Sequence, residues 1–173
     1  DYGGWIRYNE LKDADLKEQS KTEFKIMPKI SLVVPMYKTK EKFLKELIEC
    51  LIRQSYPDWE LCLADGSDKE NPVYKKYVEL DSRIKYKFLG KNLGISGNSN
   101  EGLKMATGDW VALLDHDDLL KPDALYEIVK VINEKPNVRF IYTDEDKIKD
   151  IDNIRFDAHF KPDFSPDYIR CTN

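Results

Sequence analysis

The chain has 173 residues, of which 41% are hydrophobic and 35% charged, and its formal net charge is −4. This length suits one globular domain with its own core. The acidic balance argues against nucleic acid as a partner, so a bound polyanion would need a local device such as a metal ion. The absence of any apolar run of about eighteen residues argues against a membrane-spanning helix.

The three cysteines, Cys50, Cys62 and Cys171, have an odd count and no paired spacing. They are therefore predicted to be reduced rather than paired in disulfides or bound to a metal. The polar N-terminus has no signal-peptide pattern. We expect the cytoplasm as the compartment.

Residues 1–28 have little strand character. Apolar residues at Trp5, Ile6, Tyr8, Leu11 and Leu16 indicate a helical arm with a weak apolar side. A flexible leader or linker is the alternative. Pro28 marks the predicted boundary, and residues 29–173 form the predicted main domain.

Strand and helix patterns alternate through most of the main domain. The first helix is expected over 41–54 with Thr39 as its N-cap, a second near 71–80, a short third through Leu103 and Ala106, and a fourth from Pro122 onward. The strands are expected at Ile30–Val34, Glu60–Ala64, Ile84–Phe88, Trp110–Leu114 and Val138–Thr143. This alternation predicts an α/β fold with a mostly parallel central sheet flanked by helices.

The fourth predicted strand runs directly into three carboxylates, Asp115, Asp117 and Asp118. Ligands of open α/β sheets bind at the carboxyl ends of the strands. Three acids at this spacing repel one another unless a positive charge neutralises them, and a hard divalent cation with oxygen ligands would do so. A solvated acidic turn that caps the next helix is the alternative.

Further candidates follow the other predicted strands at the same edge. Tyr37 could stack on a ligand ring or merely cover the core, and Asp65 could bind a base or ribose or merely form a turn. The glycine-rich loop after the third strand permits close backbone approach to an anion, but it matches neither a P-loop nor the dinucleotide fingerprint. The full set is Pro35 and Tyr37, Asp65, then Asn92, Gly94, Gly97 and Asn98, then Asp115 to Asp118, and Asp144 to Asp146.

Five motifs in order carry a resemblance to a known family. They are Ile30 to Tyr37, Gln54 to Leu61, Asp65-Gly66-Ser67, Asn92-Leu93-Gly94 with Asn100-Glu101-Gly102, and Leu114 to Asp118 with Pro122 to Leu125. Together they resemble family 2 glycosyltransferases of the GT-A fold. Two later motifs, Tyr142 to Asp146 and Phe160 to Asp167, resemble the rhamnosyltransferase-like branch that builds bacterial surface polysaccharides.

The resemblance implies a site for a nucleotide-diphospho-sugar donor. Pro35, Tyr37 and Asp65 would surround the base and ribose, and Asp115 would face the ribose or join the metal site. Asp117 would hold Mn²⁺ or Mg²⁺ on the diphosphate, with Asp118 beside it. Asn92, Gly94, Gly97 and Asn98 would line the nucleotide from the third strand.

The resemblance also implies inversion at the anomeric carbon, with a glycan or lipid-linked acceptor and a carboxylate base. Asp144, with its neighbours Glu145 and Asp146, is the candidate base within these residues, because no later acidic motif is evident before Asn173. Lining of the donor or acceptor pocket is the alternative role for these acids. The chain is thus expected to be truncated at its acceptor side, as part of a longer multidomain protein. The inner face of the membrane, reached by peripheral association, is an alternative location.

Two other functions remain open at this point. A sugar-phosphate nucleotidyltransferase would be expected to carry a Gly-rich loop with Arg or Lys after the first strand, and Pro35-Met36-Tyr37-Lys38 is not one. A non-catalytic nucleotide-sugar-binding module of a larger protein would keep the acidic motif without the base.

Overall fold

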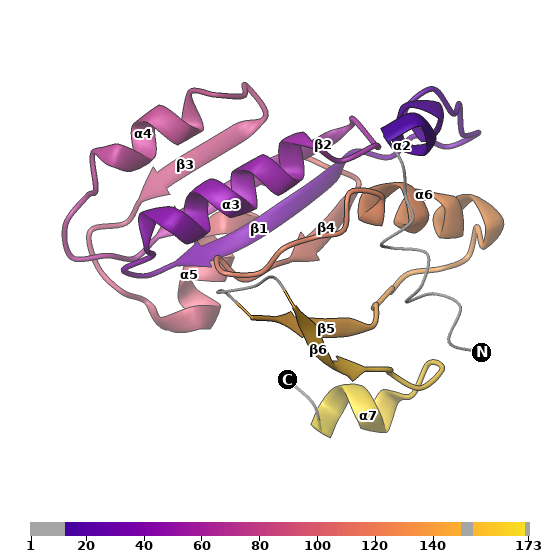
Figure 1. Cartoon of the computed structure of the whole chain (residues 1–173). Helices are drawn as coiled ribbons and strands as arrows, with labels where there is room; N and C mark the ends of the chain where they lie inside the picture. The colour runs from indigo at the N-terminus through magenta and orange to yellow at the C-terminus, as the bar shows by residue number, and fades with distance from the viewer. Residues whose placement is uncertain (1–12, 150–153, 172–173) are drawn as a thin grey trace. The chain divides into compact units, whose positions relative to one another are not determined.

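The structure is a computed structural model that describes residues 13–149 and 154–171 (Figure 1). The chain divides into two compact units, Asp1–Pro136 and Asn137–Asn173. Each unit is described by itself below.

The first unit is built on a four-stranded sheet in the order β3-β2-β1-β4. Its strands are β1 (Ile30–Met36), β2 (Trp59–Asp65), β3 (Ile84–Phe88) and β4 (Trp110–Leu113), and all three pairings are parallel. Ile30 pairs with Trp59 on one side and with Trp110 on the other. The predicted first four strands and the mostly parallel α/β sheet are therefore confirmed.

Helices cover both faces of the central strands. Alternate residues of a strand point to opposite faces. Ile30, Leu32, Val34 and Met36 lie in one buried cluster with residues of α3 (Glu41–Ile52) and α6 (Ala124–Glu134). On the opposite face α5 (Gly94–Leu103) approaches Val33 (Figure 1). Helix α4 (Val73–Val78), which connects β2 to β3, contributes Tyr74 to the cluster on the α3 face.

Two helix starts differ from the sequence-based expectation. The N-cap of α3 is Lys40 rather than Thr39, and the buried Thr39 hydroxyl has no hydrogen-bond partner within the described residues. Helix α6 begins at Ala124, two residues after Pro122, whose carbonyl accepts a hydrogen bond from the Ser55 amide. That bond fixes Pro122 in the loop before the helix.

The segment before β1 packs on the rest of the first unit. Its helix α2 spans Asp13–Gln19, and the Ser55 hydroxyl donates to the Gln19 side chain at 3.0 Å. Asn133 exchanges two hydrogen bonds with the backbone of Ile26, at 2.8 and 2.9 Å. The residues from Trp5 to Leu11 lie outside the described residues, and the boundary at Pro28 stays a prediction.

The buried carboxylate of Glu60 bonds to residues at the amino ends of the strands. Its side chain is 1% exposed and accepts hydrogen bonds from the Ser31 hydroxyl at 2.7 Å and the Thr107 hydroxyl at 2.9 Å. The ammonium groups of Lys29 and Lys85 pair with it at 2.7 and 2.9 Å. Burial raises the pKa of Glu60, but the bonds from Lys29, Lys85, Ser31 and Thr107 together hold it far below its usual range.

The second unit contains an antiparallel pair, β5 (Glu145–Ile148) and β6 (Arg155–His159), followed by α7 (Pro166–Cys171). The predicted fifth strand at Val138–Thr143 is wrong, because these residues form no strand in the described structure. Phe140 is 54% exposed, so its apolar ring has no buried sheet face to pack on.

Within the described residues, no helix is both long and apolar enough to cross a membrane.

Candidate functional site

The carboxyl ends of the four parallel strands meet at one edge of the sheet, and the loops that follow them are joined by hydrogen bonds. The Gly66 amide donates to the Met36 carbonyl at 2.9 Å, which links the loop after β2 to the end of β1. The Lys38 amide donates to the Ser67 hydroxyl at 2.9 Å. Beyond β4, the Leu114 amide donates to the Val33 carbonyl at 3.2 Å and holds the chain beside β1 just before Asp115.

The end of β1 presents an aromatic ring. Pro35 is half-buried within the strand, and Tyr37, just beyond it, is 39% exposed. The Lys38 ammonium lies 4.8 Å from the centre of the Tyr37 ring, and Lys38 has a φ of 50°, in the left-handed region. This turn leaves the Tyr37 ring partly open to a planar ligand.

Asp65, the last residue of β2, is fully buried. One carboxylate oxygen accepts from the Ser67 amide at 2.9 Å, and the other accepts from the Tyr86 hydroxyl at 2.9 Å. Burial, followed by the Asp65 carboxylate, raises the pKa of Tyr86, so its hydroxyl remains a donor. Because the Asp65 carboxylate has no exposed surface here, a base could reach it only after a local rearrangement.

Sequence reasoning missed Tyr86. Tyr86 pairs with Leu63 in the parallel register, and Phe88, two residues on, pairs with Asp65. The contact between Tyr86 and Asp65 can be inferred from the sequence once the register of β2 and β3 is known, because Tyr86 lies two residues before the partner of Asp65.

The segment after β3 is largely helical rather than the predicted loop. Helix α5 begins at Gly94, whose φ of 74° favours glycine. The Asn92 carboxamide oxygen accepts from the Gly94 amide at 2.9 Å and from the Asn98 side chain at 3.2 Å. Asn98 is 2% exposed, and Gly97 lies on the same helix. The structure therefore brings Asn92, Gly94 and Asn98 together.

The acidic segment after β4 is open to solvent. Asp115, Asp117 and Asp118 are exposed, and the Asp118 amide donates to the Asp115 carbonyl at 3.2 Å, which closes a turn. The His116 ring nitrogen Nδ1 lies 3.8 Å from the Asp117 carboxylate and makes no hydrogen bond to the part of the chain that the structure describes.

The metal prediction is compatible with this donor set but is not tested by it. No group of three or more His, Cys, Asp or Glu side chains that could hold an ion occurs within residues 13–149 and 154–171. Mg²⁺ and similar hard cations are commonly bound by one or two carboxylates together with substrate phosphates and waters. Asp115 and Asp117 supply carboxylates of that kind.

Asp144 to Asp146 do not follow a strand of the parallel sheet as predicted, because no strand forms over 138–143 and these residues belong to the second unit. One carboxylate oxygen of Asp144 accepts from the Lys161 amide at 2.8 Å, and the Lys161 ammonium pairs with Glu145 at 2.9 Å. The Tyr142 hydroxyl donates to the Pro162 carbonyl at 2.7 Å. The two later sequence motifs therefore contact each other, while the role of Asp144 as a base stays a prediction.

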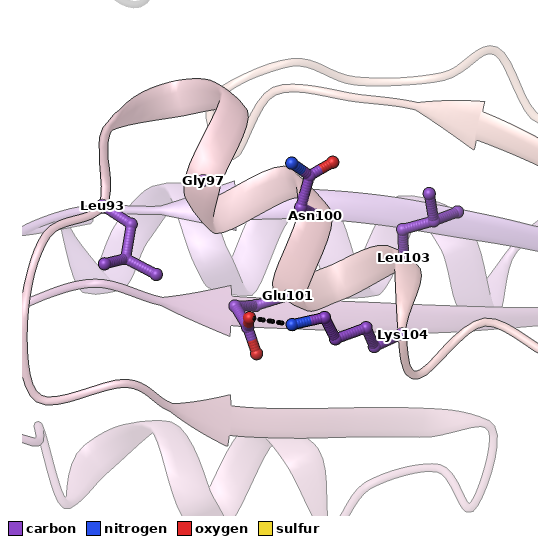
Figure 2. A pocket seen from close by; sticks show the side chains of 6 residues that line it. All are labelled: Leu93, Gly97, Asn100, Glu101, Leu103 and Lys104. Atoms are coloured by element: carbon purple, nitrogen blue, oxygen red, sulfur yellow. Dashed lines mark hydrogen bonds and ion pairs between the residues drawn. The ribbon is translucent and has the colours of Figure 1, made fainter.

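Two hollows border the loops at this edge and α5. The larger, of about 640 Å³, lies along α5 and is lined by Leu93, Gly97, Asn100, Glu101, Leu103 and Lys104 (Figure 2). Lys104, then Lys87, lower the pKa of Glu101 to about 2. The charged groups of this hollow are therefore already paired with each other or with Lys87. The smaller, of about 340 Å³, is lined by Lys38, Thr39, Ser67, Asp68, Lys69, Asn71 and Tyr74 from the loops after β1 and β2 and from α4.

Comparison with known proteins identifies the family. Residues 31–168 match the model described as Glycosyl transferase family 2. The chain belongs to this family. Glycosyl transferase family 2 thus covers the first unit from β1 onward and most of the second.

Two similar proteins are much longer than this chain. Protein y4gI of Sinorhizobium fredii is 47% identical over 149 residues, and the match covers 84% of this chain and 16% of that protein. The O-antigen biosynthesis protein RfbC of Myxococcus xanthus is 31% identical over 176 residues, covering 100% of this chain and 14% of that protein. The chain therefore spans about one-seventh of the length of these relatives.

A solved structure shares the fold. The structure of S. aureus TarS 1–349 in complex with UDP matches with a TM-score of 0.57 and 25% sequence identity, covering 66% of this chain and 38% of that one. The family match and this structural likeness confirm the predicted GT-A type of glycosyltransferase fold.

Proposed function

We propose that this chain is the donor-binding part of an inverting glycosyltransferase that moves a sugar from a nucleoside diphosphate to a glycan or lipid-linked acceptor in cell-surface polysaccharide synthesis. The observation that carries the proposal is the convergence of Tyr37, Asp65 and the acidic segment after β4 at one sheet edge. The complex of TarS with UDP and the role of RfbC in O-antigen biosynthesis support the same assignment.

In this proposal the loops after β1 and β2 hold the nucleoside. The open face of Tyr37 would stack on the base, with Pro35 beside it. Asp65 would accept a hydrogen bond from the base after a local rearrangement that exposes its carboxylate. The smaller hollow between these loops offers space for a planar group. Asn92, Gly94 and Gly97 would lie along the nucleotide, near the amino end of α5, where the positive end of the helix dipole favours an anion.

The diphosphate would lie at the acidic segment. Asp117 would hold Mn²⁺ or Mg²⁺, with Asp115 as its neighbour or as a partner of the ribose, and Asp118 would stay close by. A bound cation offsets the negative charge that a departing nucleoside diphosphate gathers. The carboxylates of Asp115 and Asp117 would themselves orient the donor. Both are exposed, so neither needs a buried partner while the donor is absent.

An acceptor hydroxyl would attack the anomeric carbon from the side opposite the diphosphate, which inverts the configuration there. As its bond to the sugar forms, the hydroxyl proton passes to a carboxylate base. Asp144 is the candidate base in this chain. If the base belongs to another part of a longer protein, the chain is a nucleotide-sugar-binding module, and its small share of the relatives' length favours that second candidate.

We further propose that residues 29–173 form the donor side of a longer multidomain protein, preceded by the arm of residues 1–28. The proposed site of action is the cytoplasm or, for a lipid-linked acceptor, the inner face of the membrane.

Calorimetric titration of the 173-residue chain with UDP, GDP and dTDP, each with and without Mn²⁺, tests the proposal. We expect one of these nucleotides to bind in the presence of Mn²⁺ and to bind more weakly without it. Failure of all three to bind would overturn the donor site. Equal affinity with and without the ion would overturn its metal dependence alone.

A further inference from the structure

We infer that Asn98 and Gly66 form an interlock that sets the spacing of the loops after β1, β2 and β3 and so positions the donor-binding residues Tyr37 and Asp65. We use "interlock" for the contact between the Asn98 carboxamide and the Gly66 backbone. The inference rests on the proposed donor site and assigns Asn98 a positioning role in place of direct contact with the nucleotide.

Asn98 reaches two of the loops by hydrogen bonds. Its amide nitrogen donates to the Met36 carbonyl at 3.4 Å and to the Asn92 side chain at 3.2 Å, and its oxygen accepts from the Leu93 amide at 3.1 Å. With only 2% of the residue exposed, the carboxamide is occupied by protein rather than offered to a ligand.

The third loop is held by close approach to Gly66. A Cβ at this position would lie 2.5 Å from the Asn98 amide nitrogen and 2.9 Å from its oxygen. The backbone of Gly66 does not have a positive φ, so glycine is required here by space and not by conformation. The loop after β2 can therefore lie against Asn98 only while residue 66 has no side chain.

The carbonyl of Met36 joins the two halves of the interlock. It accepts from the Gly66 amide at 2.9 Å as well as from Asn98. Met36 immediately precedes Tyr37, and Gly66 immediately follows Asp65. A displacement of the Asn98 side chain would therefore move both proposed nucleoside contacts, although Asn98 itself would touch neither base nor phosphate.

A double-mutant cycle on nucleotide affinity tests this inference. Gly66→Ala and Asn98→Ala should each weaken binding of the nucleotide found by calorimetry by about tenfold. In the Asn98→Ala background, which makes room for the new methyl group, Gly66→Ala should have little further effect. A general loss of packing would instead add the two losses, because independent effects are additive.

Leu103→Ala provides the control on the same helix, since Leu103 is 48% exposed at the carboxyl end of α5, and its affinity should match that of the native chain. If Gly66→Ala fails to fold, Asn98→Ala alone carries the test, because it creates no clash. Native affinity in Asn98→Ala, or additive losses in the cycle, would overturn the interlock while leaving the donor site intact. Absence of nucleotide binding by the native chain would overturn the donor site and the interlock with it.

Discussion

Asp117 offers the sharpest single-residue test of the metal proposal. Its side chain is 53% exposed, so Asp117→Asn should fold as the native chain does. The amide is a far weaker ligand for a hard cation than a carboxylate. We expect the variant to lose Mn²⁺-dependent nucleotide binding in calorimetry while its thermal unfolding midpoint stays unchanged.

Asp58→Asn is the matched control for this test, because Asp58 is an exposed aspartate just before β2, at the amino edge of the sheet. Its affinity should equal that of the native chain. Retention of Mn²⁺-dependent binding by Asp117→Asn would show that another group holds the ion.

Glu60 should govern the acid sensitivity of the fold. Because its pKa is lowered in the folded state, its ionisation stabilises the chain above the unfolded-state value near 4.5, and this contribution is lost as the pH falls toward the folded-state value. Glu60→Gln removes hydrogen bonds from charged partners, so we expect it to lower the free energy of unfolding by about 2–3 kcal/mol at pH 7. Urea titrations at pH 7 and pH 4 should show the difference from the native chain shrinking at the lower pH.

Glu49→Gln serves as the comparison for Glu60, because the Glu49 side chain is 49% exposed. Its effect should stay within about 0.5 kcal/mol at both pH values. A constant difference between Glu60→Gln and the native chain across this pH range would contradict the assigned ionisation.

At the scale of elements, α5 depends on Gly102 for its contact with the sheet. A Cβ there would lie 2.8 Å from a methyl group of Val33 and 3.5 Å from the Cys62 carbonyl. Gly102→Val should therefore push the helix away from β1 and β2, and we expect it to lower the free energy of unfolding by about 1–3 kcal/mol in urea denaturation.

Leu103→Val separates this clash from the lower helix propensity of valine, because Leu103 follows Gly102 and is 48% exposed. Its cost should stay below about 1 kcal/mol. Equal costs for the two variants would mean that the space beside Val33 does not limit the packing of α5.

The first four strands could be predicted from the sequence because their apolar runs are short and bounded by turn residues, as in Ile30–Met36 and Trp59–Asp65. The start of α5 at Gly94 could not be predicted from the sequence. Its glycines and asparagines have low helix propensity, and tertiary packing on β1 and β2 overrides that preference.

In the second unit the sequence predicted a strand where the structure has none. Val138–Thr143 has the composition of a strand without a partner to pair with, whereas the largely charged segment Glu145–Ile148 pairs with Arg155–His159. Ion pairs support that hairpin, with Arg155 and Asp146 2.8 Å apart. Pairing partners of this kind are set by contacts between strands, which local periodicity does not report.

At the scale of the whole molecule, the sequence indicated that the residues after the first four strands collect at the carboxyl edge, because parallel strands all end at the same edge of a sheet. The same prediction is wrong for Asp144 to Asp146, because no fifth strand precedes them. The sequence did not indicate whether the side chains of the residues at this edge point into the protein or toward solvent. The burial of Asp65 against Tyr86 and of Asn98 against Gly66 depends on register and on loop contacts. The residue types in the sequence therefore indicated where the candidate site lies, but they did not indicate which of its side chains are exposed.

The edge strand β4 leaves apolar side chains on the surface of this chain. Val111 is 45% exposed and Leu113 76% exposed, while Trp110 and Ala112 pack on the core. Exposed apolar edge strands promote association. We expect Leu113→Lys to reduce concentration-dependent light scattering while changing the free energy of unfolding by no more than about 0.5 kcal/mol.

Ala112→Lys is the contrasting variant, because its side chain would enter the packed face of β4. It should lower the unfolding midpoint clearly. Unchanged scattering by Leu113→Lys would show that this edge does not drive association of the chain.

The pairing of Ile30 with two tryptophans gives the fold an intrinsic optical reporter. Trp59 is 1% exposed with the Arg83 guanidinium 3.7 Å from its ring centre, and Trp110 opens β4, so both indoles lie at the end of the sheet away from Tyr37. Once Trp5, which lies outside the described residues, is replaced by phenylalanine, emission should shift to the red on unfolding and stay constant during nucleotide titration. Fluorescence would then follow the integrity of the sheet independently of what its opposite rim binds.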